Sequence, residues 1–177
     1  MTNQDLPLTI RPARQDDEAF LVALTPRLAD FPLPAWRTAE EIARADRHLL
    51  HDALTGELPH SSILVAELPP GGERAGYVFA TTKHDYFTRA AHAHVEILAV
   101  EPGAEGRGVA RALMDAIEQW AMRRGYTWVT LNVFDGNARA RALYDRLGYE
   151  PETTHYRKAL SRSRDHAGVF DHRDKSP

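Results

Sequence analysis

The sequence predicts an α/β (α+β) fold in which a mixed central sheet of six to seven strands is flanked by helices. In the first half of the chain, two strand-like apolar runs are joined by a Pro-Pro-Gly-Gly turn, which predicts a hairpin. In the second half, strand-like runs alternate with runs of helical spacing, a pattern typical of mixed sheets. The length of 177 residues fits one domain that buries a sizeable core.

The N-terminal part predicts a strand, a helix and a loop. Residues 8–13 alternate apolar and polar side chains, as a strand does. Asp16 and Asp17 can cap a following helix. That helix has an apolar stripe at helical spacing, formed by Phe20, Leu21, Leu24 and Leu28. Two prolines within residues 30–36 end the helix and leave large apolar side chains in a loop.

The next segments predict a second helix and the hairpin. Thr38 followed by Glu41 has the spacing of a capping box, so we expect a helix over residues 39–54. The hairpin strands are expected over residues 62–68 and 74–82, on either side of the Pro-Gly turn.

The C-terminal half predicts alternating strands and helices. Strands are expected over residues 92–100, 128–134 and 153–160, and helices over 108–124 and 137–147. From these patterns we expect one domain over residues 1–160, followed by a polar, flexible tail over residues 161–177.

Composition excludes several classes of protein. With no cysteine, the chain has no disulfide scaffold, thiolate zinc site or cysteine nucleophile. The formal charge of −3, from 22 basic and 25 acidic residues, gives no overall sign of a nucleic-acid partner. The start of the sequence has no signal-peptide pattern, and no apolar run is long enough to span a bilayer. We therefore expect a cytoplasmic protein with neither a membrane nor a nucleic acid as partner.

The most informative segment, residues 95–114, reads as a strand, a turn, a glycine-rich loop and a helix. Gly106 and Gly108 allow a close backbone approach, and the start of the helix presents unpaired N–H groups, which suits a phosphate or pyrophosphate. Arg107 and Arg111 could add charge-assisted bonds. The same loop could serve only to cap the helix. Its spacing matches neither a P-loop nor a Gly-x-Gly-x-x-Gly dinucleotide motif.

A second segment, residues 131–149, reads as a strand, a turn and a helix. Asn137 and Tyr144 are seven residues apart, so they share one helix face, and Gly148 stands where a left-handed C-cap is expected. A plainer interpretation is also open, in which Asn137 caps the helix and Tyr144 is a half-buried core residue.

Together the two segments resemble the GNAT superfamily of acetyl-CoA-dependent N-acetyltransferases. The first is similar to the family's acetyl-CoA motif, with Leu98-Ala-Val100 ending the strand and Glu105-Gly-Arg-Gly-Val-Ala110 opening the helix. The second is similar to an Asn-x-x-Ala-x-x-Leu-Tyr-x-x-x-Gly-Phe/Tyr motif and contains Asn137, Ala140, Leu143, Tyr144, Gly148 and Tyr149. Glu105 departs from the family pattern, which has Gln or Arg there. An acidic side chain beside a pyrophosphate is unfavourable unless it points to solvent or pairs with Arg107.

The resemblance implies a GNAT-like sheet and direct transfer of an acetyl group from acetyl-CoA to a primary amine of a small molecule or peptide. It also allows a homodimer. The residues that it assigns to acetyl-CoA are Leu98, Ala99, Val100, Glu105, Gly106, Arg107, Gly108, Val109, Ala110, Arg111, Asn137 and Tyr144.

The same resemblance implies catalytic roles. Tyr144, whose phenol is protonated at neutral pH, would donate a proton to the leaving sulfur. Glu96 is the first candidate for the base and His94 the second. His92, His94 and Glu96 alternate and so share one strand face, which by parity also carries Leu98 unless a bulge intervenes. A solvated strand face without a catalytic role is the plainer alternative.

Other functions stay open. His92, His94 and Glu96 could instead hold zinc or iron in a metal-dependent enzyme or metal-binding module, although we expect no metal. A non-catalytic sensor that binds acyl-CoA is the third alternative. For the acceptor amine, the predicted binding residues are Phe31, Leu33, Trp36, Tyr86 and Glu96. A carboxylate suits a cationic amine of any kind, so the sequence leaves the particular amine undetermined.

Overall fold

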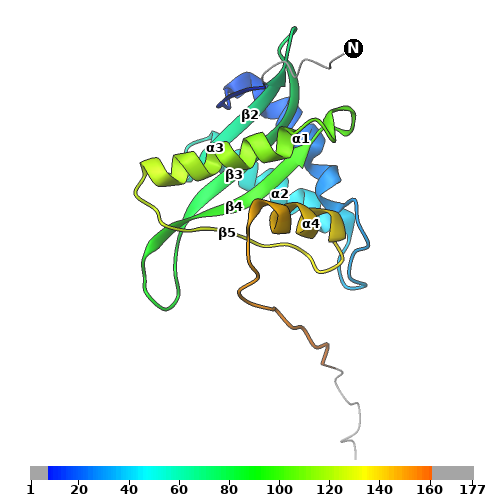
Figure 1. Cartoon of the computed structure of the whole chain (residues 1–177). Coiled ribbons are helices and arrows are strands. Elements are labelled where there is room, and N and C mark those ends of the chain that lie inside the picture. The colour runs from blue at the N-terminus through cyan, green and yellow to red at the C-terminus, as the bar shows by residue number, and fades with distance from the viewer. Residues whose placement is uncertain (1–7, 161–177) are drawn as a thin grey trace, which may run out of the picture.

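The computed structural model describes residues 8–160 and shows a five-stranded sheet with helices on both faces (Figure 1). The strands follow one another across the sheet in chain order, and all neighbours are antiparallel except β4 and β5, which are parallel. The strands are β1 (Thr9–Pro12), β2 (Ser62–Leu68), β3 (Glu73–His84), β4 (Ala91–Val100) and β5 (Val129–Leu131). The helices are α1 (Glu18–Leu24), α2 (Ala39–Leu54), α3 (Val109–Arg123) and α4 (Ala138–Leu147).

The mixed sheet flanked by helices is confirmed, but the described residues form five strands rather than six to seven. The strand expected over residues 153–160 is absent from the structure. Every residue of that segment is exposed, including its two large apolar side chains, Tyr156 and Leu160, so no burial stabilises a strand there. The strand expected over 128–134 is reduced to β5. The tail expected over 161–177 lies outside the described residues.

The two N-terminal helices are built differently. Thr38 and Glu41 form the predicted capping box, and α2 has the predicted bounds. The helix expected from Asp16 onward is divided into a 3-10 helix over Gln15–Asp17, α1, and a second 3-10 helix over Thr25–Ala29. Pro26, in the first turn of the last segment, cannot donate the backbone hydrogen bond that would continue α1. None of the described helices is long and apolar enough to cross a membrane.

Two apolar layers cover the two faces of the sheet. On β3, Val78 and Ala80 pack with residues of α3, whereas Tyr77 and Phe79 pack with residues of α1 and α2. In Figure 1, α3 crosses the near face of the sheet and α2 lies behind it. We call the side of the sheet that packs with α3 the α3 face, and the side that packs with α1 and α2 the α2 face.

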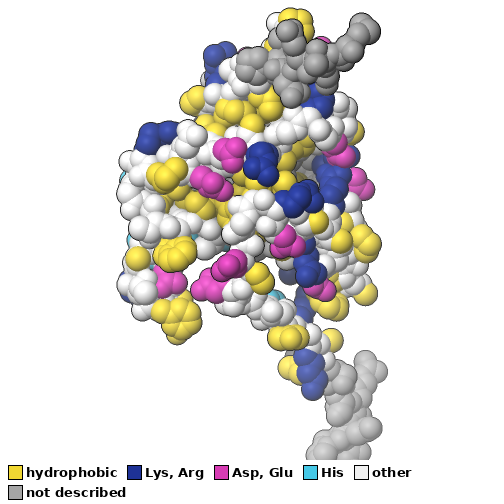
Figure 2. Space-filling view, in the orientation of Figure 1, with side chains coloured by type: hydrophobic (Ala, Val, Ile, Leu, Met, Phe, Trp, Pro, Cys, Tyr) yellow, Lys and Arg dark blue, Asp and Glu magenta, His cyan; other side chains and the backbone are white. Residues whose placement is uncertain are grey.

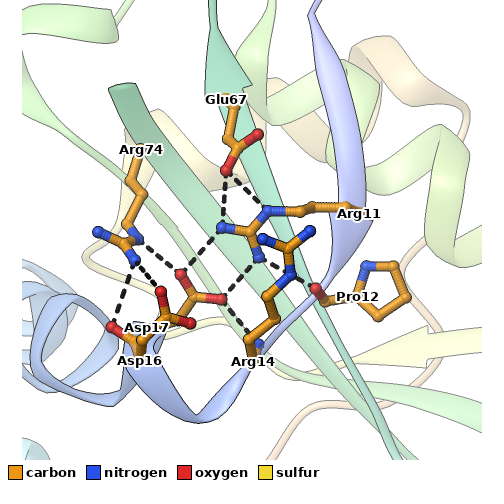
Figure 3. Close-up of polar contacts among 7 residues, drawn as sticks. All are labelled: Arg11, Pro12, Arg14, Asp16, Asp17, Glu67 and Arg74. Carbon is orange, nitrogen blue, oxygen red and sulfur yellow. Dashed lines mark hydrogen bonds and ion pairs between the residues drawn. The ribbon is translucent and has the colours of Figure 1, made fainter. Parts of the chain in front are cut away.

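A buried ion cluster fastens the start of α1 to the sheet (Figure 3). The carboxylate of Asp17 is fully buried and accepts hydrogen bonds from the guanidinium groups of Arg11 on β1 and Arg74 on β3, each at 2.6 Å. It also accepts from the backbone N–H of Arg14 at 2.7 Å. These bonds, that from Arg11 foremost, hold the pKa of Asp17 well below its ordinary value. Arg11 also pairs with Glu67 on β2, so one cluster joins three strands.

A bulge in β4 changes which side chains share a face. Opposite β3, Phe79 pairs with Ile97 and Ala80 with Val95, so Glu96 is an extra residue in the ladder. Val95 and Leu98 lie in the α3-face layer and Ile97 in the α2-face layer. The parity expectation that Glu96 shares a face with Leu98 is therefore wrong. The extra residue turns Glu96 to the α2 face, where its carboxylate accepts a hydrogen bond from Thr81.

Candidate active site

The glycine loop presents a row of backbone donors. Gly106 and Gly108 have φ angles of 72° and 78°, in the left-handed region that favours glycine, and Gly108 is the N-cap of α3. Within the part of the chain that the structure describes, no side chain caps the helix. Among the described residues, the N–H groups from Gly106 to Arg111 have no hydrogen-bond acceptor. Free N–H groups at a helix start, with the positive end of the helix dipole, form a site for an anion.

Beside this loop, β4 and β5 part. Their pairing ends at Val95 with Leu131, whereas β4 continues to Val100. No described strand covers the edge of β4 over Leu98, Ala99 and Val100 on this side. An extended chain could therefore add to that edge by backbone hydrogen bonds, as in β-strand addition. The predicted cofactor residues thus lie one after another along the unpaired end of β4 and in the loop that follows it.

The charges around the loop differ from the sequence expectation at one point. The Glu105 carboxylate does not pair with Arg107 but accepts from Arg27 and from Arg139, the latter at 2.8 Å. Arg107 and Arg111 are exposed. Figure 2 shows Lys and Arg side chains over the end at which α3 begins. Because two cations neutralise Glu105, its charge does not prevent an anion from binding to the loop.

Helix α4 carries the second predicted motif. Asn137 is its N-cap and accepts a hydrogen bond from the N–H of Ala140 at 3.1 Å, so the capping role that we left open is real. Gly148 is the left-handed C-cap, as predicted. Tyr144 packs against the α3-face layer and meets the edge of Tyr149 at 5.8 Å between ring centroids. Burial raises the pKa of Tyr144 to about 12, which keeps its phenol protonated at neutral pH.

The predicted bases lie on the opposite face of β4. Glu96 is half-buried, and its Oε1 accepts from Thr81 at 2.7 Å and lies 2.9 Å from Nζ of Lys83. His94 is buried, with Nδ1 at 2.7 Å from the Thr130 hydroxyl and Nε2 at 3.3 Å from the Asn132 amide. Burial, and secondly the charge of Lys83, lowers the pKa of His94 to about 4, so its ring is neutral at pH 7.

Sequence reasoning missed two polar residues on the α2 face of the sheet. Asp46 lies on α2, half-buried, and Tyr77 lies on β3, fully buried. Burial, with a further contribution from the charge of Glu96, raises the pKa of Asp46 to about 6. A signal for Asp46 was present in the sequence. It stands three residues after Ala43 and four before Leu50, both buried, so a charge occupies the apolar stripe of α2.

The predicted acceptor residues are only partly brought together. Phe31 meets Phe134 at 5.3 Å between ring centroids, and a Cβ on Gly136 would lie 2.5 Å from the carbonyl oxygen of Pro32. The loop after α1 therefore packs closely on the loop after β5. Phe134 lines a surface hollow of about 310 Å³ beside α2, together with Arg37, Glu41, Ile42, Ala45 and Asp46.

Three other residues predicted to bind the acceptor do not line that hollow. Leu33 is half-buried, and Trp36 is 55% exposed with the guanidinium of Arg157 5.8 Å from its ring centroid. Tyr86 is 80% exposed in the turn between β3 and β4, where it contacts only its neighbour Phe87 among aromatic rings of the described chain. The structure thus gives no support to Tyr86 as an acceptor-binding residue.

The metal alternative gains no support. Within residues 8–160, no group of three or more His, Asp or Glu side chains is arranged to hold a metal ion. The two ring nitrogens of His94 already face Thr130 and Asn132. Oε1 of Glu96 faces the ammonium of Lys83.

A helix that follows a glycine loop, beside two parted parallel strands, defines a class of fold that can hold an extended anionic ligand. The model of the Acetyltransferase (GNAT) family matches residues 23–149, which is more than half of the chain. The chain therefore belongs to the GNAT family of acetyltransferases.

Solved structures share this fold. Ribosomal-protein-alanine N-acetyltransferase from Brucella melitensis has a TM-score of 0.64 and 20% identity, over 87% of this chain and 100% of that chain. The aminoglycoside N-acetyltransferase AAC(6')-Iy in complex with CoA has a TM-score of 0.66 and 20% identity, over 90% of this chain and 100% of that chain. At these identities the likeness concerns the fold.

One curated relative is closer in sequence over a shorter stretch. Mycothiol acetyltransferase from Beutenbergia cavernae is 46% identical over 66 residues, which make up 37% of this chain and 22% of that protein. The match thus covers about a fifth of the relative, and its printed activity describes the relative alone.

Acetyl-CoA is the acetyl donor of the GNAT family, and the residues present fit it. The unpartnered N–H groups of residues 106–111 suit a pyrophosphate, and the open edge of β4 suits an extended amide-containing arm. The one unfavourable charge, on Glu105, is paired with Arg27 and Arg139.

Proposed function

We propose that this protein transfers the acetyl group of acetyl-CoA directly to a primary amine in a ternary complex. The observation that carries the proposal is that β4 and β5 part after Val95, with different groups on the two faces of β4. The free backbone donors and Tyr144 lie toward its α3 face, and Glu96 with His94 lies toward its α2 face. A donor bound along the α3 side and an acceptor bound on the α2 side would meet at the gap between β4 and β5.

On the donor side, the chain binds and orients. The N–H groups of residues 106–110 hold the pyrophosphate, with Arg107 and Arg111 adding charge. The backbone of Leu98 to Val100 pairs with the pantetheine arm. The amide of Asn137 donates to the same arm, because its capping bond uses only the side-chain oxygen.

At the reacting atoms, bound acetyl-CoA supplies a thioester whose carbonyl carbon an amine can attack. A backbone N–H near Leu98 faces the acetyl oxygen and stabilises the charge that develops there. Tyr144 gives its phenolic proton to the leaving sulfur. The phenol carries this proton at every physiological pH.

On the acceptor side, Glu96 is the base that removes a proton from the ammonium group. Its Oε1 is occupied by Thr81 and Lys83, whereas Oε2 forms no hydrogen bond within the described chain and lies 3.9 Å from His94 Nε2. Oε2 can therefore accept a proton, directly or through a water. His94 is held by Thr130 and Asn132 and is better suited to positioning Glu96 than to serving as the base.

The test is release of CoA thiol from acetyl-CoA in the presence of a panel of primary amines, with the acetylated amine identified by mass spectrometry. Amine-dependent thiol release is the expected result. Tight CoA binding with no transfer to any amine would instead favour the acyl-CoA sensor. The cytoplasmic location and the homodimer stay predictions.

A further inference from the structure

One primary amine of the chain itself lies at the proposed base. Nζ of Lys83, near the end of β3, is 2.9 Å from Oε1 of Glu96, a distance at which the ammonium donates a hydrogen bond to the carboxylate. The side chain of Lys83 is 44% exposed, so this amine is accessible. A lysine side chain ends in a primary amine, which is the kind of acceptor that the proposed reaction requires.

The pairing of β3 with β4 sets the position of this amine. Thr81, two residues before Lys83 on β3, donates to the same oxygen of Glu96 at 2.7 Å. Residues two apart on a strand project from the same face of the sheet, so the backbone of β3 directs both side chains toward Glu96. The bulge at Glu96 turns its carboxylate to meet them. The contact thus depends on the sheet and not on a flexible loop.

The other lysines of the chain have no such neighbour in the structure. The sequence contains three lysines, Lys83, Lys158 and Lys175. Lys158 is exposed in the segment after α4, and the ion pair with Glu96 is the one ion pair among residues 8–160 that contains a lysine. Lys175 lies outside the described residues. Lys83 is therefore the lysine that the described fold places beside a candidate base.

We propose that Lys83 is itself an acetyl acceptor, so that the protein acetylates its own Lys83 from acetyl-CoA when no other amine is bound. This inference rests on the proposed acetyl transfer. It assigns a modification site within the chain, in addition to the transfer to an external amine.

The chemistry uses groups that are already in place. The Lys83 ammonium gives one proton to the Glu96 carboxylate, and the freed nitrogen attacks the carbonyl carbon of the thioester. An amide N–C bond forms as the C–S bond breaks, and the phenol of Tyr144 gives its proton to the departing sulfur. The nitrogen loses a second proton, which restores the phenol, and Glu96 releases its proton to solvent. The products are acetyl-lysine at position 83, CoA thiol and one proton.

A lysine that only holds Glu96 in place would behave differently. Partly exposed ion pairs of this kind are common and have small effects on stability, so the contact alone gives Lys83 no reason to react. Such a lysine would stay unmodified in the presence of acetyl-CoA. Acetylation would instead remove its charge and its ion pair with Glu96. The state of the Lys83 side chain after incubation therefore separates the two roles.

The experiment incubates the full-length protein with saturating acetyl-CoA at pH 8 without added amine, and follows the intact mass and the peptide masses with time. We expect about one CoA thiol released and one acetyl group gained per chain. Lys83 should be acetylated at least about tenfold faster than Lys158, because a general base contributes about 10²–10⁴-fold. Lys158 is the matched internal control, since it is exposed and reports uncatalysed reaction with acetyl-CoA.

Three further measurements sharpen the test. Lys83→Arg keeps a cation for Glu96 but has no amine to acetylate, so the rapid gain of an acetyl group should disappear. Lys158→Arg should keep it. Glu96→Gln should slow acetylation of Lys83 to the rate at Lys158 without changing the latter. Because the transfer occurs within one chain, the first-order rate constant should be unchanged on tenfold dilution of the protein.

The outcomes separate this inference from the proposed function. Acetylation of Lys83 no faster than that of Lys158, or equally fast in Glu96→Gln, would overturn the inference. So would a rate constant that falls in proportion to dilution, because the transfer would then occur between chains. If added amines are acetylated while Lys83 stays unmodified, acetyl transfer stands and the inference alone fails. No CoA release with or without amines would contradict the proposed function itself.

Discussion

The two faces of the sheet around β4 recognise their ligands by different means. On the α3 face, the proposed donor site consists mainly of backbone groups: the N–H groups of residues 106–111 and the uncovered edge of β4. On the α2 face, the proposed acceptor site consists of side chains from β3 and β4. Backbone groups are common to every sequence that folds this way, whereas side chains differ. The donor face is therefore expected to define the family and the acceptor face the particular substrate.

The largest effect should come from Glu96 on the acceptor face. Glu96→Gln keeps an acceptor for Thr81 but removes the base, so kcat/KM for the amine should fall by about 10³-fold, within the usual range for a lost general base. Glu101→Gln, just beyond the end of the same strand, is the control. A fall of less than threefold in steady-state assays would remove Glu96 from the mechanism.

Tyr144 tests the donor face at the leaving group. Tyr144→Phe should lower kcat by about 10²-fold with little change in the Kd of acetyl-CoA, because the ring still packs and only the proton is lost. Tyr149→Phe is a matched control, since its hydroxyl donates instead to Glu118 at 3.0 Å. Equal turnover in the parent and in Tyr144→Phe would show that the sulfur leaves without this acid.

The smallest effect concerns Glu105 on the donor face. Glu105→Gln removes the negative charge and frees Arg27 and Arg139, which can then attract a phosphate. The Kd of acetyl-CoA should decrease by about threefold at low salt, and the gain should shrink as added salt screens the charges. An increase in Kd would mean that the ion pairs are needed to hold the loop in place.

A contrast between local and long-range contacts explains which features the sequence predicted correctly. Local signals were reliable because each acts on its immediate neighbours in the chain. The glycines at 106, 108 and 148 and the cap at Thr38 predicted the loop, α3 and the ends of α2 and α4. The bulge at Glu96 depends on pairing with β3 and has no local signature, so simple alternation placed Glu96 on the wrong face.

Contacts between segments that are distant in the sequence also could not be predicted from it. Asp46 and Tyr77 come together only when α2 packs on β3, and Glu105 meets Arg27 and Arg139 only in the fold. The strand expected over 153–160 failed for a related reason, because alternation predicts a strand only where one side is buried.

The central claim, that donor and acceptor bind on different faces of β4, is tested most directly by calorimetric titration of acetyl-CoA into Gly108→Ala and Glu96→Gln. Gly108→Ala strains a residue at φ 78°, which costs about 1–2 kcal/mol in the loop conformation, so the Kd should rise about tenfold. Glu96→Gln should bind acetyl-CoA as the parent does. A Kd that rises equally in both variants, or is unchanged in Gly108→Ala, would contradict the account.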